Sequence, residues 1–408
     1  MAGVDHGWHR GGGDLPRQFR ERRMMQWCNV CGTSLGAPIF AGEEAASITT
    51  MNALIAGQTA VHLCTVCGHL QTRALPDLER YYAEEYSINA DGVDDDQLYE
   101  IRDGREIYRS EHQATILMQK LDLTRPLKVL DYGCAKGATL RRVVESCPGV
   151  QPYLFDVTER YLEFWKKFPG DPRFAAHHVD PAWAGTLDVV LSFYALEHIP
   201  NLTAALEDFR NLLRPGGTLY FIVPNVYRNA ADFIVADHVN HFSERSLQTM
   251  LHRAGFGQVE IDVDAHAAAF VVTCRKEDLA QGAGPAALAE ISHDEIAALV
   301  DFWGAAKSRI QAAEAALPEG SSVAIYGAGI YGNFIRTCLK RPDRVVAFMD
   351  QNRFLHGRVV NGLRVQPPAA MIGVVSAIFV GLNPRIARRA MDELSQSAGQ
   401  ELPCIFLD

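Results

Sequence analysis

The fold is decided by the segment Lys128–Leu140, which reads KVLDYGCAKGATL. An apolar run ends in the acid Asp131, a turn carrying Gly133 and Gly137 follows, and a helical pattern begins at Leu140. This order predicts a strand, a tight loop and a helix, because glycine lets the backbone approach a ligand closely. The loop would bring the free N–H groups of a helix N-terminus to the carboxyl end of a parallel strand. Open α/β sheets bind adenosine-bearing ligands at that point.

Further strand signals follow at the spacing of an α/β sheet. Tyr153–Asp156 ends in an acid that can accept hydrogen bonds from both ribose hydroxyls, and His178–Asp180 marks the end of a third strand. Residues 186–193 form an apolar strand that runs into Ala195–Ile199, which reads ALEHI. Leu213–Pro224 reads as a turn, LRPGG, that leads into a fifth strand. We therefore expect an α/β fold with a Rossmann-like sheet.

These segments together resemble the motifs of class I S-adenosylmethionine (SAM)-dependent methyltransferases. The first loop has the spacing D-x-G-x-A-x-G, in which Ala135 replaces the family's middle glycine. The pair Glu197-His198 and the LRPGG turn match the family as well. Taken alone, the first loop would also fit an ordinary glycine-containing strand–helix turn. The resemblance implies a class I methyltransferase fold with SAM as cofactor, bound by Asp131, Gly133, Ala135, Gly137, Asp156 and Asp180.

The composition fits a globular protein of more than one domain. The chain has 408 residues, of which 48% are hydrophobic and 22% charged, and its net charge is −10. A single core rarely grows to this length, so we expect two or three domains. The negative charge argues against nucleic acid as a partner, and no apolar run is long enough to cross a membrane. Nine cysteines, and no apolar signal core in residues 1–23, favour a reducing, cytoplasmic location.

Two C-x-x-C pairs near the N-terminus have the spacing of a metal site, formed by Cys28, Cys31, Cys64 and Cys67. Four thiolates fill the tetrahedral coordination of Zn²⁺ and leave no open position, so the zinc would be structural. Free thiols or a redox pair are the alternatives, but a redox C-x-x-C normally stands alone beside a βαβ unit. His69 is surplus to this site and is expected at the surface.

A polar segment interrupts apolar residues just past the fifth strand, in Asp237–Ser243, which reads DHVNHFS. Imidazole titrates near neutral pH, so His238 and His241 form a candidate acid–base pair. Alternatively, they only bond to backbone groups or cap the helix that starts near Ser243. No third ligand is near in the sequence, which argues against zinc there.

The C-terminal part opens with a second glycine loop after the strand Val323–Tyr326. It is a full G-x-G-x-x-G, formed by Gly327, Gly329 and Gly332, and the strand Val345–Asp350 after it also ends in an acid. The remaining chain is too short for a complete dinucleotide fold with a hydride-transfer domain. Three interpretations stay open: the loop binds the nucleotide of a substrate, it binds NAD, or its glycines only allow close helix–strand packing.

The order of a four-cysteine unit, a methyltransferase core and a Rossmann-like C-terminal unit resembles the sugar C-methyltransferases of deoxysugar biosynthesis. Those enzymes methylate a nucleotide-linked 4-keto-6-deoxy sugar at the third ring carbon. The matching motifs are the four cysteines, EHIP at Glu197–Pro200 and DHVNHFS at Asp237–Ser243. The resemblance implies zinc ligation by the cysteines and a nucleotide-linked sugar as substrate, and it places His238 on the family's catalytic base.

Our mechanistic hypothesis is removal of a proton beside a ketone, followed by methylation of the resulting enolate. His238 would be the base, oriented by Asp237 or Tyr86, and His198 or Asn240 would donate a hydrogen bond to the enolate oxygen. Three of the family's motifs on the substrate side are altered in this chain. They read VADH at Val235–His238, EYSI at Glu85–Ile88 and VPNV at Val223–Val226. Alternative functions are a sugar O-methyltransferase, an NAD-dependent oxidoreductase using the Gly327 loop, and a non-catalytic zinc-containing assembly protein.

We expect four segments along the chain. They are a disordered tail at 1–23, a zinc-binding domain at 24–104, a SAM-dependent methyltransferase domain at 105–280, and a C-terminal helical brace with a Rossmann-like domain at 281–408. Within them, the acidic run at 91–96 predicts a solvated loop, residues 105–121 predict a helix, and residues 281–285 predict a linker. Neither the identity of the sugar nor the oligomeric state follows from the sequence.

Overall fold

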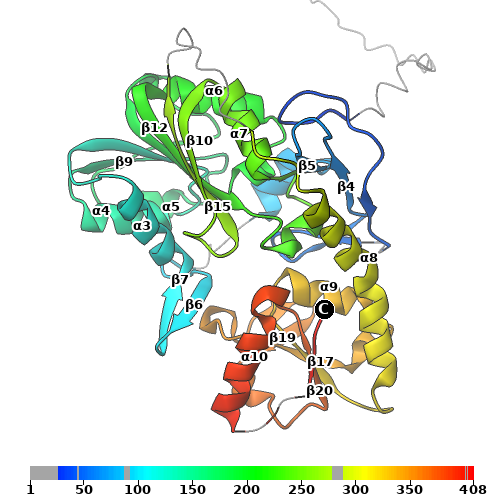
Figure 1. The fold of residues 1–408 in the computed structure, drawn as a ribbon. Coiled ribbons are helices and arrows are strands. Elements are labelled where there is room, and N and C mark those ends of the chain that lie inside the picture. Colours follow the sequence, from blue (N-terminus) through cyan, green and yellow to red (C-terminus); the bar gives the residue numbers. More distant parts are fainter. Residues whose placement is uncertain (1–25, 44–45, 87–91, 278–287, 400, 402) are drawn as a thin grey trace, which may run out of the picture.

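The computed structural model describes residues 26–408 except 44–45, 87–91, 278–287, 400 and 402. The predicted tail at 1–23 and a predicted linker at 281–285 lie outside the described residues. Three units follow one another: a small N-terminal β unit, a central α/β unit and a C-terminal α/β unit (Figure 1).

The N-terminal unit consists of short strands joined by turns that carry the cysteines. Its strands are β1 (Phe40–Ala41), β2 (Ala46–Ile48), β3 (Leu54–Ala56), β4 (Ala60–Leu63) and β5 (Leu70–Thr72). β2 and β3 pair with each other, and the larger sheet has the order β1-β4-β5-β13. The last strand, β13 (Asn240–His241), comes from the central unit and pairs antiparallel with β5, so that Asn240 lies opposite Gln71. The two units therefore share one sheet.

A helical turn and a hairpin connect this unit to the central one. The elements are α2 (Leu78–Arg80), the π-helical turn η1 (Tyr81–Glu85), β6 (Leu98–Arg102) and β7 (Arg105–Tyr108). The sequence predicted a helix from residue 105, but α3 begins only at Arg109 because residues 105–108 pair with β6. The predicted domain boundary at 104/105 thus falls in the turn of this hairpin.

The central unit contains a seven-stranded sheet. Its strands are β8 (Leu127–Tyr132), β9 (Val150–Asp156), β10 (Arg173–Ala176), β11 (Leu187–Phe193), β12 (Leu213–Pro224), β14 (Phe256–Asp262) and β15 (Ala269–Lys276). The order is β10-β9-β8-β11-β12-β15-β14, and all pairs are parallel except those of β15. The order reverses between β8 and β11, where the loops after the strands diverge and leave a crevice. The predicted α/β class and Rossmann-like sheet are confirmed.

Helices cover both faces of the central sheet. They are α3 (Arg109–Lys120), α4 (Ala138–Ser146), α5 (Leu162–Trp165), α6 (Leu202–Leu212) and α7 (Glu244–Arg253), with the short turns η2 (Pro181–Trp183), η3 (Leu196–His198) and η4 (Ala230–Ile234). Strand residues alternate between the faces, and the successive residues Val129 and Leu130 of β8 accordingly belong to different hydrophobic cores. α7 begins next to Ser243, as predicted, but its cap is Ser243 itself, in a capping box with Ser246, and not one of the histidines that the sequence offered for this role.

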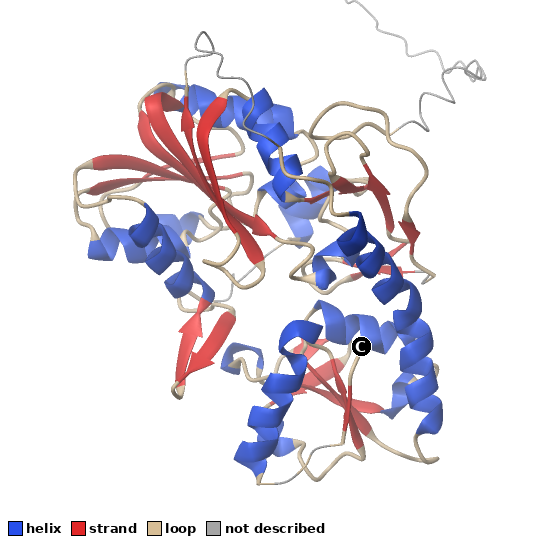
Figure 2. Ribbon diagram, viewed as in Figure 1, coloured by secondary structure: helices blue, strands red, loops and turns tan. Residues whose placement is uncertain are grey.

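The C-terminal unit is a second, smaller α/β sheet. Its strands are β16 (Val323–Tyr326), β17 (Val345–Met349), β18 (Val359–Val360), β19 (Leu363–Gln366), β20 (Ala377–Val380) and β21 (Cys404–Ile405), in the order β18-β19-β17-β16-β20-β21. Its helices are α8 (His293–Ala316), α9 (Ile330–Cys338) and α10 (Pro384–Ala398), with the short turns η6 (Pro342–Arg344), η7 (Arg353–Leu355) and η8 (Pro368–Ala370). Figure 2 shows α8 as one long helix that reaches from the side of the upper units down along this sheet.

One hydrophobic core extends across the units. It joins Val61 and Leu70 of the N-terminal unit to Phe233 of the central unit and to Trp303 and Tyr331 of the C-terminal unit. Because these side chains are buried only against one another, each unit depends on its neighbours for part of its core. No helix in the described part of the chain has the length and apolar character needed to span a membrane.

The acidic stretch before β6 also connects units, although the sequence predicted a solvated loop. The Asp96 carboxylate accepts hydrogen bonds from the backbone N–H and the hydroxyl of Ser110. Lys136, in the first glycine loop, donates to the backbone carbonyl of Asp95. The Asn352 side-chain amide, from the C-terminal unit, donates to the Asp96 carbonyl at 3.3 Å. These contacts hold residues 95–96 between the glycine loop and the C-terminal unit.

Candidate functional site

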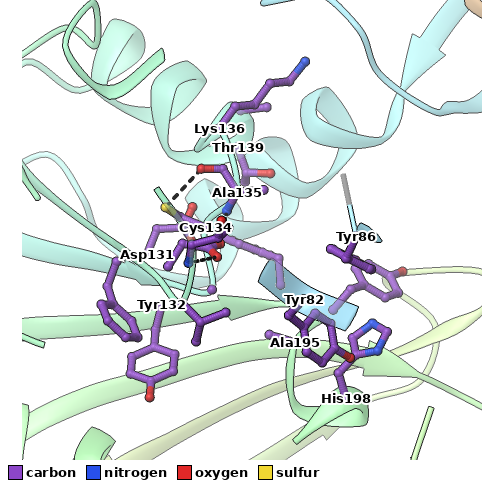
Figure 3. A pocket seen from close by; sticks show the side chains of 18 of the residues that line it. Tyr82, Tyr86, Asp131, Tyr132, Cys134, Ala135, Lys136, Thr139, Ala195 and His198 are labelled. Carbon is purple, nitrogen blue, oxygen red and sulfur yellow. Dashed lines mark hydrogen bonds between the residues drawn. The ribbon is translucent and has the colours of Figure 1, made fainter. Parts of the chain in front are cut away.

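A cavity of about 330 Å³ lies at the point where the strand order reverses. Its walls are the glycine loop after β8, the end of β9 and the turn after β11, and the helical turns α2 and η1 close one end. Figure 3 shows Asp131 and Ala135 of the glycine loop on one side, and Tyr82, Tyr86 and His198 gathered on the other. The volume lies within the range of small-molecule sites.

The glycine loop forms because two of its positions exclude a side chain. Gly133 and Gly137 have φ angles of 74° and 72°, in the left-handed region that favours glycine. A Cβ atom at Gly133 would lie 2.9 Å from the Cβ of Ala195, and one at Gly137 would lie 2.8 Å from the ring of Phe168. Ala135, the departure from the family motif, takes a φ of 47° despite its side chain.

Asp131 presents an unpaired acceptor to this cavity. Its side chain is buried, and its Oδ1 atom has no hydrogen-bond partner among the described residues. Burial, and then the charge of Asp156, raise the pKa of Asp131 to about 8. A buried carboxylate of this kind is stabilised by a cationic hydrogen-bond donor, such as an ammonium group. The loop and this acceptor therefore fit the amino-acid end of a ligand such as SAM.

The two other predicted ribose and adenine contacts lie in different surroundings. Asp156 lines the cavity and accepts the backbone N–H of Ala135 at 2.8 Å and that of Thr158 at 3.3 Å. Burial raises the pKa of Asp156 to about 6. Asp180 is exposed, caps η2 by accepting the N–H of Ala182, and does not line the cavity. β10 ends before this residue, so the structure keeps Asp180 away from the other predicted cofactor contacts.

Aromatic side chains form the far end of the cavity. The ring centres of Tyr82 and Tyr86 lie 5.8 and 5.6 Å from that of His198 (Figure 3). The hydroxyl of Tyr82 is buried and has no hydrogen-bond partner among the described residues. The sequence assigned a catalytic role only to Tyr86, and the structure places both tyrosines in the wall of the cavity.

Behind His198, Asp232 joins the two predicted histidines. Its carboxylate oxygens lie 2.5 Å from Nδ1 of His238 and 3.0 Å from Nδ1 of His241. Although burial alone would raise it, the pKa of Asp232 is held well below its usual range by His241 and His238. Burial alone would lower the pKa of His238, but the hydrogen bond and charge of Asp232 raise it to about 9. His238 is therefore an imidazolium at neutral pH.

His198 has the opposite protonation state. Its Nδ1 lies 3.0 Å from the backbone carbonyl oxygen of Asp237, and since that oxygen can only accept, Nδ1 carries the proton. Burial and the charge of His238 lower the pKa of His198 to about 4, so its Nε2 keeps a free lone pair. The ring centres of His198 and His238 are 4.6 Å apart, and only His198 lines the cavity.

The remaining predicted residues of this region hold the cluster together. The Asp237 carboxylate accepts the N–H of Thr50 at 2.7 Å and the hydroxyl of Tyr81 at 3.0 Å. His241 is fully buried between Asp232 and the hydroxyl of Thr72. Asn240 donates both amide hydrogens to the carbonyls of Leu196 and Ile199, which leaves neither for a substrate oxygen.

Sequence reasoning missed two buried carboxylates that belong to the same cluster. Asp232 precedes His238 in a segment that carried no recognised motif. Glu197 is part of the EHIP motif, but no role was assigned to it. Both of its carboxylate oxygens lack a hydrogen-bond partner among the described residues, and burial raises its pKa to about 8.

Glu197, His198 and His238 also place one potential metal-ligand atom each within 4.8 Å of the others. In this arrangement, however, both ring nitrogens of His238 are already used. Nδ1 bonds to Asp232, and Nε2 lies 3.0 Å from the hydroxyl oxygen of Thr50. The three side chains are therefore better described as an acid–base cluster.

The four predicted metal ligands converge on one point. The sulfur atoms of Cys28 and Cys67 are 3.6 Å apart, and those of Cys31 and Cys64 are 3.4 Å apart. A tetrahedral zinc with Zn–S bonds of about 2.3 Å needs sulfur atoms roughly 3.8 Å apart, so the geometry fits Zn²⁺. His69, expected at the surface, is instead fully buried beside this cluster, with Nε2 3.2 Å from the Asn240 side-chain oxygen.

The second glycine loop packs against its own unit. A Cβ atom at Gly332 would lie 1.9 Å from the carbonyl oxygen of Gly327, and one at Gly327 would lie 2.4 Å from that of Gly381. Asn333 donates to the carbonyls of Ala328 and Gly329 from inside the helix that follows. Close packing accounts for Gly327 and Gly332 without a ligand, whereas Gly329 has no atom near the place of a Cβ.

Comparison with known proteins gives one family. Residues 105–261 match the family described as "Methyltransferase domain". In fold, the chain is similar to human N-acetylserotonin methyltransferase in complex with SAM, at 17% identity and a TM-score of 0.36 over 41% of this chain and 54% of that one. It is also similar to the CurJ carbon methyltransferase, at 18% identity and a TM-score of 0.34 over 40% and 54%. The chain thus spans about half the length of these two proteins, and scores this low carry no information on substrate. A search of curated proteins found no match.

Metal analysis tests the cysteine cluster. The purified protein should contain about one zinc per chain, because four thiolates at these distances form a closed tetrahedral site. Replacing Cys31 and Cys64 together by serine should abolish the zinc and lower the melting temperature. Cys147→Ser, which changes a cysteine outside the cluster, should keep the full zinc content. A well-folded wild-type protein without metal would contradict the assignment.

A pair of glycine substitutions tests the second loop. Gly332→Ala should lower the free energy of unfolding by about 2 kcal/mol or more, because its methyl group would overlap the Gly327 carbonyl. Gly329→Ala should leave thermal unfolding unchanged, because its Cβ would face open space. If Gly329→Ala instead weakens substrate binding without a change in stability, the loop binds a ligand and packing alone does not explain it.

Proposed function

We propose that this chain, a SAM-dependent methyltransferase whose methyltransferase domain occupies residues 105–261, methylates a nucleotide-linked keto sugar on a carbon atom. The proposal rests on the resemblance to sugar C-methyltransferases and on the cluster of His198, His238 and Glu197 at the far end of the cavity. Methylation of a carbon beside a ketone needs a proton acceptor and a donor to the developing oxyanion. His198 offers the proton acceptor, Tyr82 offers a hydroxyl donor with no other partner among the described residues, and His238 adds a positive charge next to His198.

Three residues of the cavity would bind the ammonium group, the ribose hydroxyls and the carboxylate of the cofactor. SAM, when bound, supplies an electrophilic methyl group on a sulfonium, so the protein has to position it and provide a competent nucleophile. Asp131 would accept from its ammonium group, and Asp156 would accept from its ribose hydroxyls. Arg109 also lines the cavity, with its guanidinium carbon 4.5 Å from the ring centre of Tyr194, and would bind the carboxylate.

We assign the two histidines the reverse of the roles expected from the sequence. His198 faces the cavity with a free Nε2 lone pair and would accept the substrate proton. His238, kept protonated by Asp232, would place a positive charge beside the forming enolate oxygen. The electron pair left by the departing proton moves onto that oxygen, where the imidazolium and the unused Tyr82 hydroxyl would stabilise it.

The unpaired carboxylate of Glu197 completes this arrangement. Once His198 takes a proton, two imidazolium rings lie in contact, and their repulsion would oppose the transfer. An ionised Glu197 beside both rings would offset that repulsion. With a pKa of about 8, part of the Glu197 population is already ionised near pH 8, before the transfer begins.

The direct test is incubation with isotope-labelled methyl donor and a panel of nucleotide-linked keto sugars, with the label located by NMR. Carbon-bound label beside the ketone is the expected result. Label on a sugar hydroxyl would show an O-methyltransferase, in which the same His198 deprotonates the hydroxyl. Failure of every sugar to accept the label would overturn the substrate class while leaving cofactor binding unaffected.

The pH dependence of SAM binding tests Asp131. In the free protein its carboxyl group has a pKa of about 8, and pairing with an ammonium group requires the ionised form. Below pH 8, Asp131 must therefore release a proton when SAM binds. As the pH rises from 6.5 to 8, the Kd for SAM should fall by up to about tenfold per pH unit. Calorimetry measures both the affinity and the proton release.

Asp131→Asn should flatten this pH profile and weaken binding by about 10- to 100-fold at pH 8, because a charge-assisted hydrogen bond is lost. Asp188→Asn, near the start of strand β11, is the matched control and should keep the wild-type affinity. A wild-type affinity that does not change with pH would rule out this role for Asp131.

The pH profile of the reaction tests the roles of the histidines. Because the pKa of His198 is lowered to about 4 and that of His238 is raised to about 9, kcat/KM should be level near neutral pH and fall above pH 9. Asp232→Asn removes the carboxylate that favours the imidazolium, so the alkaline limb should move to lower pH and kcat should drop roughly a hundredfold. If the rate instead rises through pH 9, His238 is the base and the roles are as the sequence suggested.

A further inference from the structure

We propose that Asn240 and Asn29 connect the four-cysteine knuckle to the Glu197-His198 turn, so that the N-terminal unit positions the acid–base cluster and does more than stabilise the fold. Asn240 is then a positioning residue that acts through His198. The role of His198 rests on the proposed function, whereas the connection itself is a feature of the described residues.

The connection begins inside the first cysteine pair. Asn29 lies between Cys28 and Cys31, and its side-chain amide donates to the Asn240 side-chain oxygen at 2.9 Å. Its backbone N–H donates to the side-chain oxygen of Gln71 at 2.8 Å. Asn29 is thus bonded to both Gln71 and Asn240, which lie opposite each other where β5 pairs with β13.

A second contact comes from the other cysteine pair. His69 follows Cys67 after one residue, and its Nε2 lies 3.2 Å from the same oxygen of Asn240. The Asn240 oxygen therefore accepts from one residue beside each half of the metal cluster. Two acceptor contacts of this kind use both lone pairs of an amide oxygen.

Asn240 passes this constraint to the catalytic turn. Its two amide hydrogens go to the carbonyl of Leu196 at 2.9 Å and to that of Ile199 at 2.8 Å, which are the residues on either side of Glu197-His198. Within the part of the chain that the structure describes, neither Glu197 oxygen has a hydrogen-bond partner, so the turn is held from this side through its backbone. Asn240 has no exposed surface. Loss of its side chain would leave the Asn29 amide, His69 Nε2 and the Ile199 carbonyl without a hydrogen-bond partner among the described residues, whereas the Leu196 carbonyl keeps the N–H of Ile199.

The connection should affect catalysis separately from cofactor binding. The glycine loop, Asp131 and Asp156 belong to β8, β9 and their loops, whereas the side-chain hydrogen bonds of Asn240 within the described residues go to Asn29, His69, Leu196 and Ile199. A shift of the Glu197-His198 turn would misplace the proton acceptor, while the glycine loop, Asp131 and Asp156 on the opposite side of the cavity keep their positions. Loss of Asn240 should therefore lower kcat far more than it weakens SAM binding.

The test compares Asn240→Ala and Asn29→Ala with the control Asn211→Ala, which changes an exposed asparagine on α6. Each full-length protein is measured for zinc content, SAM affinity by calorimetry, and kcat and KM for methyl transfer. The ring nitrogens of the histidines are recorded by ¹⁵N NMR, which reports the Nδ1-protonated form of His198 without any acceptor substrate.

Asn240→Ala should keep its zinc and keep its SAM affinity within about twofold, while kcat falls by about 10- to 100-fold. The His198 ring signals should shift toward a mixture of tautomers. Asn29→Ala should change the same quantities in the same direction but less, because Asn240 keeps both bonds to the turn. The control should match the wild type.

Two results would overturn the proposal. One is wild-type kcat and unchanged His198 signals in Asn240→Ala. The other is a parallel loss of SAM affinity and kcat, which would show a general structural role. Should Asn240→Ala fail to fold, Asn29→Ala decides the question by the same measurements. If no keto sugar is methylated by the wild type, the NMR and calorimetry still judge the connection, so its failure is distinguishable from failure of the proposed function.

Discussion

The pairing of β5 with β13 is the interaction on which the candidate site depends. β5 follows the second cysteine pair, and β13 carries Asn240 and His241 in the centre of the histidine segment. Because side chains alternate along a strand, a shift of one residue in this pairing would turn His241 away from Asp232 and Asn240 away from the Glu197-His198 turn. The second cysteine pair lies just before β5 and fixes where that strand starts. Hydrogen bonds to Asn240 from Asn29, inside the first pair, and from His69, beside the second pair, oppose any shift of the pairing. The cysteine cluster is thus connected through this pairing to the acid–base groups.

Burial then separates the proton affinities of groups that lie in contact. Asp232 is ionised because two imidazoles bond to it, and it makes His238 an imidazolium. His198, beside that charge and bonded to a carbonyl, stays neutral. Glu197 has no hydrogen-bond partner among the described residues, and burial raises its pKa to about 8. Adjacent groups whose pKa values are driven apart in this way are typical of acid–base catalysis, since each then has a defined direction of proton transfer.

The parts of the fold and site that follow local sequence patterns could be predicted, and those set by distant contacts could not. Glycine spacing and strand periodicity predicted the central sheet and the loop with Gly133 and Gly137, because backbone geometry there is decided within a few residues. The convergence of Cys28, Cys31, Cys64 and Cys67 was likewise predicted from spacing. The partner of His238 was not, because Asp232 reaches it only through the turn that precedes β13. The burial of His69 and the hydrogen bonds of Asn240 depend on pairing between segments that lie far apart in the sequence. From the sequence alone, His69 was therefore expected at the surface and Asn240 was expected to donate a hydrogen bond to the substrate.

The shared sheet also has a consequence for biosynthesis. Strands β1, β4 and β5 leave the ribosome long before β13 is made, so the outer edge of β5 stays unpaired while the whole central sheet is being translated. An uncovered edge can pair with a neighbouring nascent chain. Metal captured early by the cysteines would hold this edge in its final register until residues 240–241 emerge to cover it. Cells starved of zinc should therefore accumulate aggregated chains during synthesis, before any mature protein has been exposed to stress.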